Sequence, residues 1–231
     1  KKGYKVSMFD PKFKNLNLIN KKNVDVIFNA LHGKGGEDGI AQTYFEYLKI
    51  PYTHSGVISS HNSMNKIISK EIFLKKKIKT PKFFTLNKKN FKIQRLKKNI
   101  IKKKITFPLV AKPVDEGSSL GVVLCKNKNE LMKETKKLLK KYNQLIFEEY
   151  VGGQEIQVAV INGKPLGAIE LVPKRLFYDY KAKYTKSAKT KHIMPARLNK
   201  TSYNEVLKIA KKAHQVLGCK GITRSDFKYY K

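Results

Sequence analysis

Hydrophobic and polar residues alternate along the chain in blocks that predict an ordered series of strands and helices. Residues 4–9 and 24–29 are short apolar runs typical of strands, and the second is nearly continuous, as in a buried parallel strand. Apolar residues then recur at helical spacing over 40–48, and another helix is predicted from about Ser63. One face of that helix would carry Met64, Ile67, Ile68, Ile72 and Leu74.

The middle of the chain combines a strand, a lysine-rich segment and a hairpin. A strand is predicted over 82–86, and the lysine-dense residues 89–104 are typical of a solvated helix and loop. The apolar runs 109–114 and 122–125 flank a turn that contains glycine and serine, which predicts a hairpin. A helix over 128–141 would then turn three leucines inward, namely Leu131, Leu138 and Leu139.

The pattern continues with strands and one long segment of low periodicity. A strand is predicted over 145–150, followed by alternating apolar residues at Ile156, Val158 and Val160. The dipeptide Asn162-Gly163 favours a tight turn into a return strand over 166–172. Residues 174–200 show little apolar periodicity, and so long a stretch without regular elements is usually a functional loop.

A helix over about 202–217, ended by Gly218, and a strand over 222–229 complete the pattern, which is α/β at the start and hairpin-rich α+β afterwards. With 231 residues, 41% of them hydrophobic, the chain can form one large domain or two to three small ones. No apolar run approaches the roughly 18 residues of a membrane span, and no secretory signal pattern is present. Because the chain starts at Lys1 rather than Met, we expect it to be a fragment.

The formal net charge of +33 is compatible with a nucleic-acid-binding protein. However, only four of the 50 basic residues are arginine, which nucleic-acid-reading proteins use for bidentate and stacking contacts. The lysines are spread over predicted helices, turns and loops alike, as on solvated surfaces. Non-specific binding of polyanions at low salt stays open, but the absence of a recognisable motif argues against specific nucleic-acid binding.

The cysteines and histidines do not suggest a metal site or a disulfide framework. Cys125 and Cys219 lie far apart and form no CxxC pair, which fits a reducing cytoplasm. None of the five histidines forms an i, i+4 pair of the kind that binds zinc. Composition therefore favours a cytoplasmic globular protein without a membrane anchor, and its chemistry has to be read from motifs.

The loop inside the first hairpin is the most informative motif. Lys112 ends an apolar strand, and Gly117, Ser118, Ser119 and Gly121 follow it. Glycines allow sharp turns and close approach to a ligand, while serine hydroxyls and backbone amides can donate to phosphate oxygens. The lysine precedes the glycines, whereas a P-loop requires GxxxxGK[ST]. Taken alone, such a loop is more often an ordinary exposed hairpin, so other segments must decide.

Three other segments carry more polar residues than packing requires. The sequence ALHGKGGEDG, residues 30–39, follows the apolar strand 24–29 at the end where open α/β sheets bind ligands. The long loop contains FYDYKAKY, residues 177–184. In the last strand, the alternation of side chains places Arg224 and Asp226 on one face, where a simple salt bridge is the commonest explanation.

Together these segments resemble D-alanine–D-alanine ligases, which belong to the ATP-grasp superfamily. The resemblance runs from about Val24 to Tyr229 and rests on ALHGKGGEDG, IPYTHSGV, MNK, VAKPVDEGSSLGV, FYDYKAKY and GCKGITRSD, in that order. Several spaced motifs in order are far more specific than any one of them. The resemblance implies an ATP-grasp fold of mixed α/β and α+β class, preceded by part of a parallel α/β domain.

The resemblance also implies three domains and a reaction. Residues 1–65 would belong to the N-terminal substrate domain, 66–148 to the central ATP-grasp subdomain and 149–231 to the C-terminal one, with ATP between the last two. ATP would phosphorylate the carboxylate of one D-alanine, and the amine of a second D-alanine would attack the acyl phosphate. The product, D-alanyl-D-alanine, is a peptidoglycan precursor. Family members are often homodimers through the N-terminal domain.

The matching motifs imply a role for individual positions around the nucleotide. Lys66, Lys112 and Lys183 match lysines that contact the ATP phosphates, and Gly117, Ser118 and Ser119 match the loop that folds over them.

Five further positions would complete the site. Glu148 lies in the strand that borders the adenine, and Glu155 matches the acid that holds the ribose hydroxyls. Arg224 matches the arginine that stabilises the tetrahedral oxyanion, and His32 would lie near the substrate. Asp226 matches one ligand of two Mg²⁺ (or Mn²⁺) ions, whose preference for oxygen ligands suits a carboxylate.

Tyr184 matches a residue that hydrogen-bonds to the position of Ser118 and ties the mobile loop over a closed, water-free site. A tyrosine here favours an amine nucleophile, because the related D-alanine–D-lactate ligases carry histidine near this position. A D-alanine–D-lactate ligase or another ATP-grasp carboxylate ligase stays open as the alternative. The family's N-terminal glycine-rich segment and its Glu-x-Asn metal ligands have no match in the chain, so we expect the fragment to be inactive and the full gene product to be the enzyme.

Overall fold

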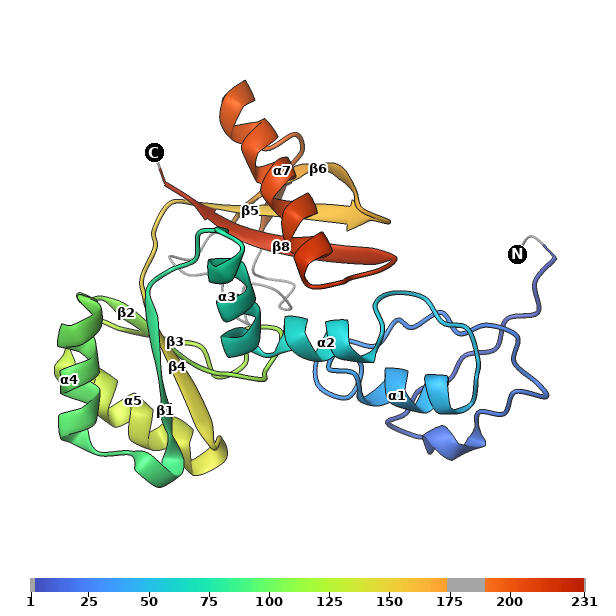
Figure 1. Cartoon of the computed structure of the whole chain (residues 1–231), viewed down its shortest axis with the longest axis horizontal. Helices are drawn as coiled ribbons and strands as arrows, with labels where there is room; N and C mark the ends of the chain where they lie inside the picture. Colours follow the sequence, from blue (N-terminus) through green and yellow to red (C-terminus); the bar gives the residue numbers. More distant parts are fainter. Residues whose placement is uncertain (1–2, 174–189, 231) are drawn as a thin grey trace.

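The computed structural model describes residues 3–173 and 190–230, and Figure 1 shows their arrangement. Two four-stranded antiparallel sheets carry most of the regular structure, and a largely irregular N-terminal segment extends away from them (Figure 1). No helix within these two ranges is long and apolar enough to cross a lipid bilayer.

The first sheet has the strand order β1-β4-β2-β3 and packs against two helices. Its hydrophobic core includes Leu96 from α4 and Leu131 from α5, and Phe84 of β1 stacks on Phe147 of β4 with ring centroids 4.9 Å apart. Leu138 and Leu139, which were predicted to face inward together with Leu131, are also buried. The elements are β1 (Phe83–Asn87), η2 (Lys88–Asn90), α4 (Ile93–Lys103), β2 (Leu109–Pro113), β3 (Val123–Cys125), α5 (Lys128–Lys141) and β4 (Gln144–Glu149).

The second sheet has the order β7-β6-β5-β8 and is covered by one long helix. Alternate residues of β5, Ile156, Val158 and Val160, are fully buried against Val206 and Ala210 of that helix. The helix ends before Gly218, which adopts φ 67° as a C-terminal capping residue. The elements are β5 (Gln154–Ile161), β6 (Lys164–Val172), β7 (Lys191–Ile193), α7 (Lys200–Val216) and β8 (Ile222–Tyr229).

Local patterns predict most of these elements correctly. The predicted helix 128–141 and strand 222–229 coincide with α5 and β8, and the first hairpin is confirmed with Leu109 opposite Cys125. Asn162 and Gly163 both have positive φ, 46° and 76°, as a tight hairpin turn requires. The long segment 174–200 was expected to lack regular elements, but its described end contains β7.

The two predicted N-terminal strands are wrong. Residues 4–9 have irregular backbone with Met8 94% exposed, and residues 24–29 form only one parallel bridge, between Ile27 and Tyr52. An apolar run becomes a strand only when neighbouring strands accept and donate its backbone hydrogen bonds. In the described part of the chain, that bridge is the only pairing of residues 24–29. Helical spacing over 40–48 is confirmed by α1 (Ile40–Tyr47), which follows the short η1 (Leu16–Leu18).

The helix predicted from about Ser63 is confirmed as α3, but it starts three residues later, because a separate helix ends at Met64. α2 (Val57–Met64) ends at Asn65, whose side-chain oxygen accepts hydrogen bonds from the amides of Ile67 and Ile68 and caps α3 (Lys66–Lys75). The predicted apolar face is only partly right: Leu74 is 52% exposed, whereas Lys70 is buried.

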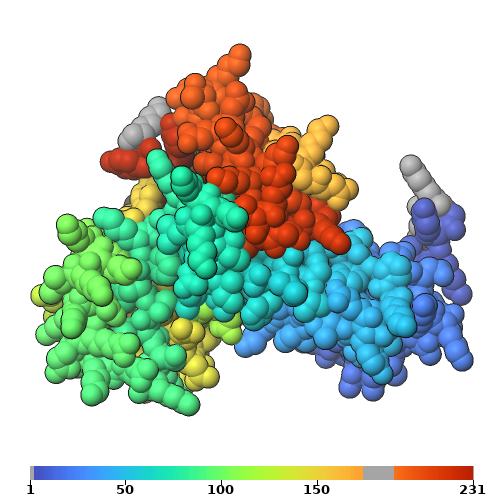
Figure 2. Space-filling model, in the orientation of Figure 1, coloured from blue at the N-terminus to red at the C-terminus, as the bar shows by residue number. Residues whose placement is uncertain are grey.

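Two segments that are far apart in the sequence, one around Ser55 and one around Gly218, contact each other. Ser55 Oγ donates to the carbonyl of Lys220 and accepts from its amide, both at 3.2 Å, and Ser59 Oγ donates to Gly218 at 2.6 Å. Gly221 has φ 59°, and a Cβ there would lie 3.0 Å from the backbone of His54. Figure 2 shows the same contact as the red C-terminal surface resting on the cyan segment. The second sheet is thereby fixed against α2.

Candidate functional site

One buried carboxylate lies between two lysines on the first sheet and α3. Lys112 of β2 and Glu148 of β4 are diagonal neighbours on adjacent strands, and Lys112 Nζ lies 2.6 Å from Glu148 Oε2. On the other side, Lys70 Nζ of α3 lies 3.0 Å from Glu148 Oε1. The side chains of Glu148 and Lys70 are only 7% and 9% exposed, while that of Lys112 is 20% exposed.

Charge balance explains how this cluster is tolerated inside the protein. Burial by itself would raise the pKa of Glu148, but the ammonium groups of Lys112 and Lys70 outweigh it and lower that pKa. Burial lowers the pKa of Lys70, and the carboxylate opposes this shift. Two cations therefore share one anion, which leaves a net positive charge next to the glycine–serine loop.

Lys66, the first residue of α3, is fixed to the beginning of that loop. Its amide donates to the carbonyl of Val114 at 3.1 Å, and its Nζ donates to the carbonyls of Val114 at 3.2 Å and Glu116 at 2.5 Å. Burial, and secondarily the charge of Lys112, lower the pKa of Lys66 to about 8. Lys66, Lys112 and Glu148, three of the residues selected from the sequence, thus lie in one cluster.

The glycine–serine loop itself adopts an unusual backbone. Ser118 and Ser119 have φ values of 51° and 60°, in the left-handed region that residues with a Cβ rarely adopt. Gly121 follows with φ 70°, and a Cβ there would lie 2.7 Å from Pro113 Cγ. Backbone strain of this kind persists only where the surroundings hold it, and it is frequent in ligand-binding loops.

A cavity of about 370 Å³ separates this loop from the ALHGKGGEDG segment. The two loops approach closely, since a Cβ on Gly117 would lie 3.3 Å from Gly33 Cα. Lys34 Nζ also pairs with Asp115 Oδ2 at 3.6 Å across the gap. His32, which the sequence placed near the substrate, lines this cavity. The lining residues are His32, Gly33, Lys34, Glu116, Gly117, Ser118 and Leu120.

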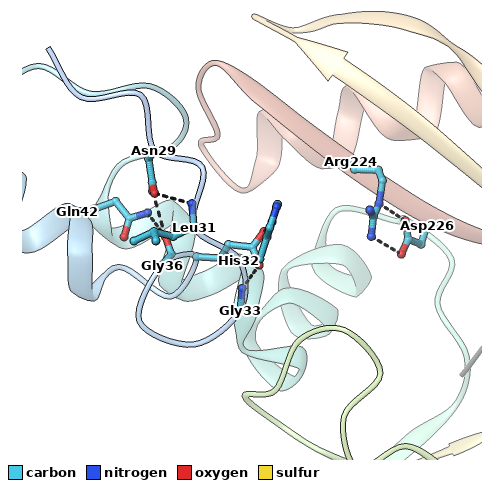
Figure 3. A network of polar contacts seen from close by, with 9 residues as sticks. Asn29, Leu31, His32, Gly33, Gly36, Gln42, Arg224 and Asp226 are labelled. Carbon is cyan, nitrogen blue, oxygen red and sulfur yellow. Dashed lines mark hydrogen bonds and ion pairs between the residues drawn. The ribbon is translucent and has the colours of Figure 1, made fainter. Parts of the chain in front are cut away.

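Buried amides hold the ALHGKGGEDG segment in shape (Figure 3). Asn29 Nδ2 and Gln42 Nε2 both donate to the carbonyl of Gly36, at 3.1 and 2.7 Å, and Asn29 Oδ1 accepts from the amide of Leu31. Gly33 donates its amide to the Glu37 carboxylate. Sequence reasoning missed Asn29 and Gln42, because each acts on the loop from a neighbouring element.

Arg224 and Asp226 form an ion pair on one face of β8, as their alternation predicted (Figure 3). Arg224 donates from Nε and from a terminal nitrogen to the two carboxylate oxygens, at 2.8 and 3.3 Å. Among residues 3–173 and 190–230, no three acidic, histidine or cysteine side chains are grouped to hold a metal ion. Glu155 pairs with Lys228 at 2.8 Å across β5 and β8.

Two of the residues selected from the sequence, Lys183 and Tyr184, lie outside the described residues. Conversely, Lys70 was not selected. It stands four residues after Lys66 on the same helix face, and this i, i+4 spacing was the available signal.

Comparison with known proteins identifies the family. Residues 4–55 match the family pattern described as the N-terminus of D-ala D-ala ligase, and residues 72–231 match its C-terminus. The chain is 52% identical over its whole length to a D-alanine–D-alanine ligase of Pelagibacter ubique, of which it covers 74%.

Two solved structures are similar to the fold. The D-alanine–D-alanine ligase of Bacillus anthracis complexed with ATP superposes on 91% of the chain with a TM-score of 0.75 and 29% identity, and 65% of that protein is covered. The VanG D-Ala:D-Ser ligase of Enterococcus faecalis superposes on 89% with a TM-score of 0.77 and 32% identity, and 60% of it is covered. The chain thus spans between 60% and 74% of the length of these relatives. With both parts of its sequence matched and its fold shared, the chain belongs to the D-alanine–D-alanine ligase family.

Proposed function

We propose that the complete product of the gene is an ADP-forming D-alanine–D-alanine ligase, and that this chain supplies its phosphate-binding loop and lysine cluster. The observation that carries the proposal is the convergence of Lys66 and Lys112 on a strained glycine–serine loop. The membership of the family and the ATP complex of the Bacillus anthracis relative support it. Lys183, in the long loop, is proposed as a third phosphate-binding lysine.

The reaction requires a carboxylate to become an electrophile. Transfer of the γ-phosphoryl group of ATP to the carboxylate oxygen of one D-alanine releases ADP and gives an acyl phosphate. The amine of a second D-alanine then attacks the acyl carbon, the C–O bond to phosphate breaks, and the nitrogen loses a proton. The protein has to neutralise the charge of the phosphoryl group in transfer and to align the two amino acids.

The chain's own residues fit these tasks. Lys66 and Lys112 provide positive charge beside Gly117, Ser118 and Ser119, whose backbone can approach phosphate oxygens. We assign Arg224 to the developing oxyanion and Glu155 to the ribose.

The roles proposed for four further residues rest on the sequence motifs alone. Asp226 would contribute one oxygen ligand to Mg²⁺ or Mn²⁺, whose charge would offset that of the phosphates. His32 would lie near a D-alanine and Glu148 beside the adenine. Tyr184 would close the site through Ser118, which would keep water from the acyl phosphate.

Lys112→Ala in the complete gene product tests the proposal. Loss of a charge-assisted contact to phosphate, worth about 1.5–3 kcal/mol, should raise the ATP concentration for half-maximal D-alanine-dependent ADP release by roughly 10- to 100-fold. Lys164→Ala, at an exposed lysine of β6, is the matched control and should leave that concentration unchanged. If the unmodified protein consumes ATP no faster with D-alanine than without it, the proposed activity is wrong.

A ligase that uses another second substrate is the alternative, and the D-Ala:D-Ser ligase among the similar structures favours considering it. Tyr184 in the sequence favours an amine nucleophile over the hydroxyl of D-lactate. Product analysis with D-alanine, D-serine and D-lactate supplied together would distinguish the three. A mixed product dominated by D-alanyl-D-lactate would overturn the assignment to D-alanine.

We also propose the domain division at residues 65/66 and 148/149, a homodimer through the N-terminal domain, and a cytoplasmic location. The helix break at Asn65 and the link between β4 and β5 support the two boundaries. The cysteines Cys125 and Cys219 are both free thiols, which supports a reducing compartment.

A further inference from the structure

Lys70 is a buried lysine that no ligand-binding role accounts for. Its Nζ is occupied by protein atoms on every side: Glu148 Oε1 at 3.0 Å, Thr80 Oγ1 at 2.5 Å and the carbonyl of Pro81 at 3.3 Å. The same ammonium lies 5.0 Å from the ring centroid of Phe83. With Nζ hydrogen-bonded to Thr80 and Pro81, ion-paired with Glu148, and a side chain only 9% exposed, Lys70 cannot reach a nucleotide without breaking this packing.

Lys112 differs from Lys70 in the contacts that hold it. In the described part of the chain, its Nζ pairs with the Glu148 carboxylate at 2.6 Å, and its side chain is about twice as exposed, 20% against 9%. It ends β2 immediately before the loop that forms the cavity wall. Lys112 is thus the more exposed cation of the cluster, with fewer contacts among the described residues, and Lys70 is the more deeply buried one.

The number of cations around Glu148 determines how strongly Lys112 is held. Glu148 is buried and charged, so it requires at least one cationic partner. If Lys112 were that only partner, phosphate groups would have to compete with a buried one-to-one ion pair to bind it. With Lys70 in place, the carboxylate remains paired when Lys112 moves to another anion.

We propose that Lys70 is a positioning residue that keeps Glu148 paired and thereby frees Lys112 to bind the phosphates of a nucleoside triphosphate. This role deepens the proposed function and rests on it. It predicts that Lys70 affects the phosphate part of the ligand through Lys112 and leaves recognition of the nucleoside unchanged.

Calorimetric titration of the complete gene product with ATP and with adenosine tests this role. Lys70→Met, which keeps most of the unbranched side chain but removes the charge, should weaken ATP binding about tenfold while adenosine affinity changes less than about twofold. Lys70→Arg should keep the ratio of the two affinities. Lys75→Met, at an exposed lysine of the same helix, is the control and should change neither.

The double variant Lys70→Met/Glu148→Gln removes both the cation and the carboxylate that would trap Lys112. Its ratio of ATP to adenosine affinity should return to within about threefold of the unmodified protein. This variant leaves no buried carboxylate without a cation, so it also serves if Lys70→Met alone fails to fold. A ratio that stays depressed in the double variant, or an equal loss for ATP and adenosine in Lys70→Met, would overturn the role of Lys70. If the unmodified protein bound no ATP, the ATP site itself would be overturned as well.

Discussion

At the scale of single residues, the surroundings of Lys66 bear directly on its proposed contact with phosphate. It is half-buried at the start of α3, and its Nζ donates to two loop carbonyls; loss of hydration, and secondarily the nearby charge of Lys112, lower its pKa and disfavour its protonated form. A phosphate brought into this position would do the opposite and favour the charged ammonium. Lys66 therefore links loop geometry to ligand charge.

A pH dependence of ATP binding follows from the pKa of Lys66, which is about 8. Below that value the residue is charged in the empty protein, and above it a proton has to be taken up on binding. Affinity for ATP should therefore fall as pH rises above about 8, by up to about tenfold per pH unit. Calorimetry over this range measures it, and Lys66→Arg, which stays charged, should flatten the profile. An identical slope in both proteins would assign the proton to another group.

At the scale of elements, the link between the two sheets depends on one glycine. Gly153 begins the approach to β5 with φ 86°, and a Cβ there would lie 2.0 Å from the carbonyl oxygen of Tyr229 at the end of β8. Its neighbour Gly152 differs, because the nearest atom to an added Cβ is Tyr150 Cε1 at 3.9 Å. Only Gly153 combines a left-handed backbone with a clash between an added Cβ and the backbone.

Replacing each glycine by alanine in a separate variant tests this difference between Gly153 and Gly152. Gly153→Ala should lower the free energy of unfolding by about 2–4 kcal/mol, because either β8 or the link has to move. Gly152→Ala should change it by less than about 1 kcal/mol. Urea denaturation of both variants gives the comparison, and equal losses would contradict the assigned clash.

The elements that could be predicted from the sequence are those whose conformation depends on residues nearby in the chain. α5 and the β5–β6 hairpin have periodic apolar residues and local turn chemistry, and both were found where expected. Residues 24–29 have a strand-like pattern too, but their conformation depends on pairing partners distant in the chain. The break at Asn65 was missed because a capping asparagine inside an apolar period is a single-residue signal.

The residues of the candidate site also differ in how far they could be predicted from nearby sequence. The glycine–serine loop and the Arg224–Asp226 pair follow from spacing along single strands and were predicted. For Lys70 the i, i+4 spacing to Lys66 was a weak signal, because an apolar face was expected on α3 and its partner Glu148 lies 78 residues further along. The roles of Lys183 and Tyr184 stay predictions from sequence.

At the scale of the whole molecule, the net charge of +33 has consequences apart from the site. The charge comes almost entirely from lysines spread over the surface, which attract polyanions through screened, non-directional interactions. The protein should therefore bind heparin or DNA at low salt and release them at about 150 mM salt, whereas neutral dextran should not bind. Fluorescence anisotropy over a salt series measures this. Tight DNA binding that persisted at about 150 mM would favour a nucleic-acid-binding function after all.

The contacts of Ser55 and Ser59 with Lys220 and Gly218 also bear on how the protein is made. These hydrogen bonds join residues 165 and 159 positions apart, so a chain growing on the ribosome can form them only after residues 218–220 have emerged. Until residues near 220 emerge, α2 lacks the surface against which it is fixed. The segment around α2 therefore lacks these contacts while the intervening residues are synthesised, and its final position is set only when the second sheet closes with β8.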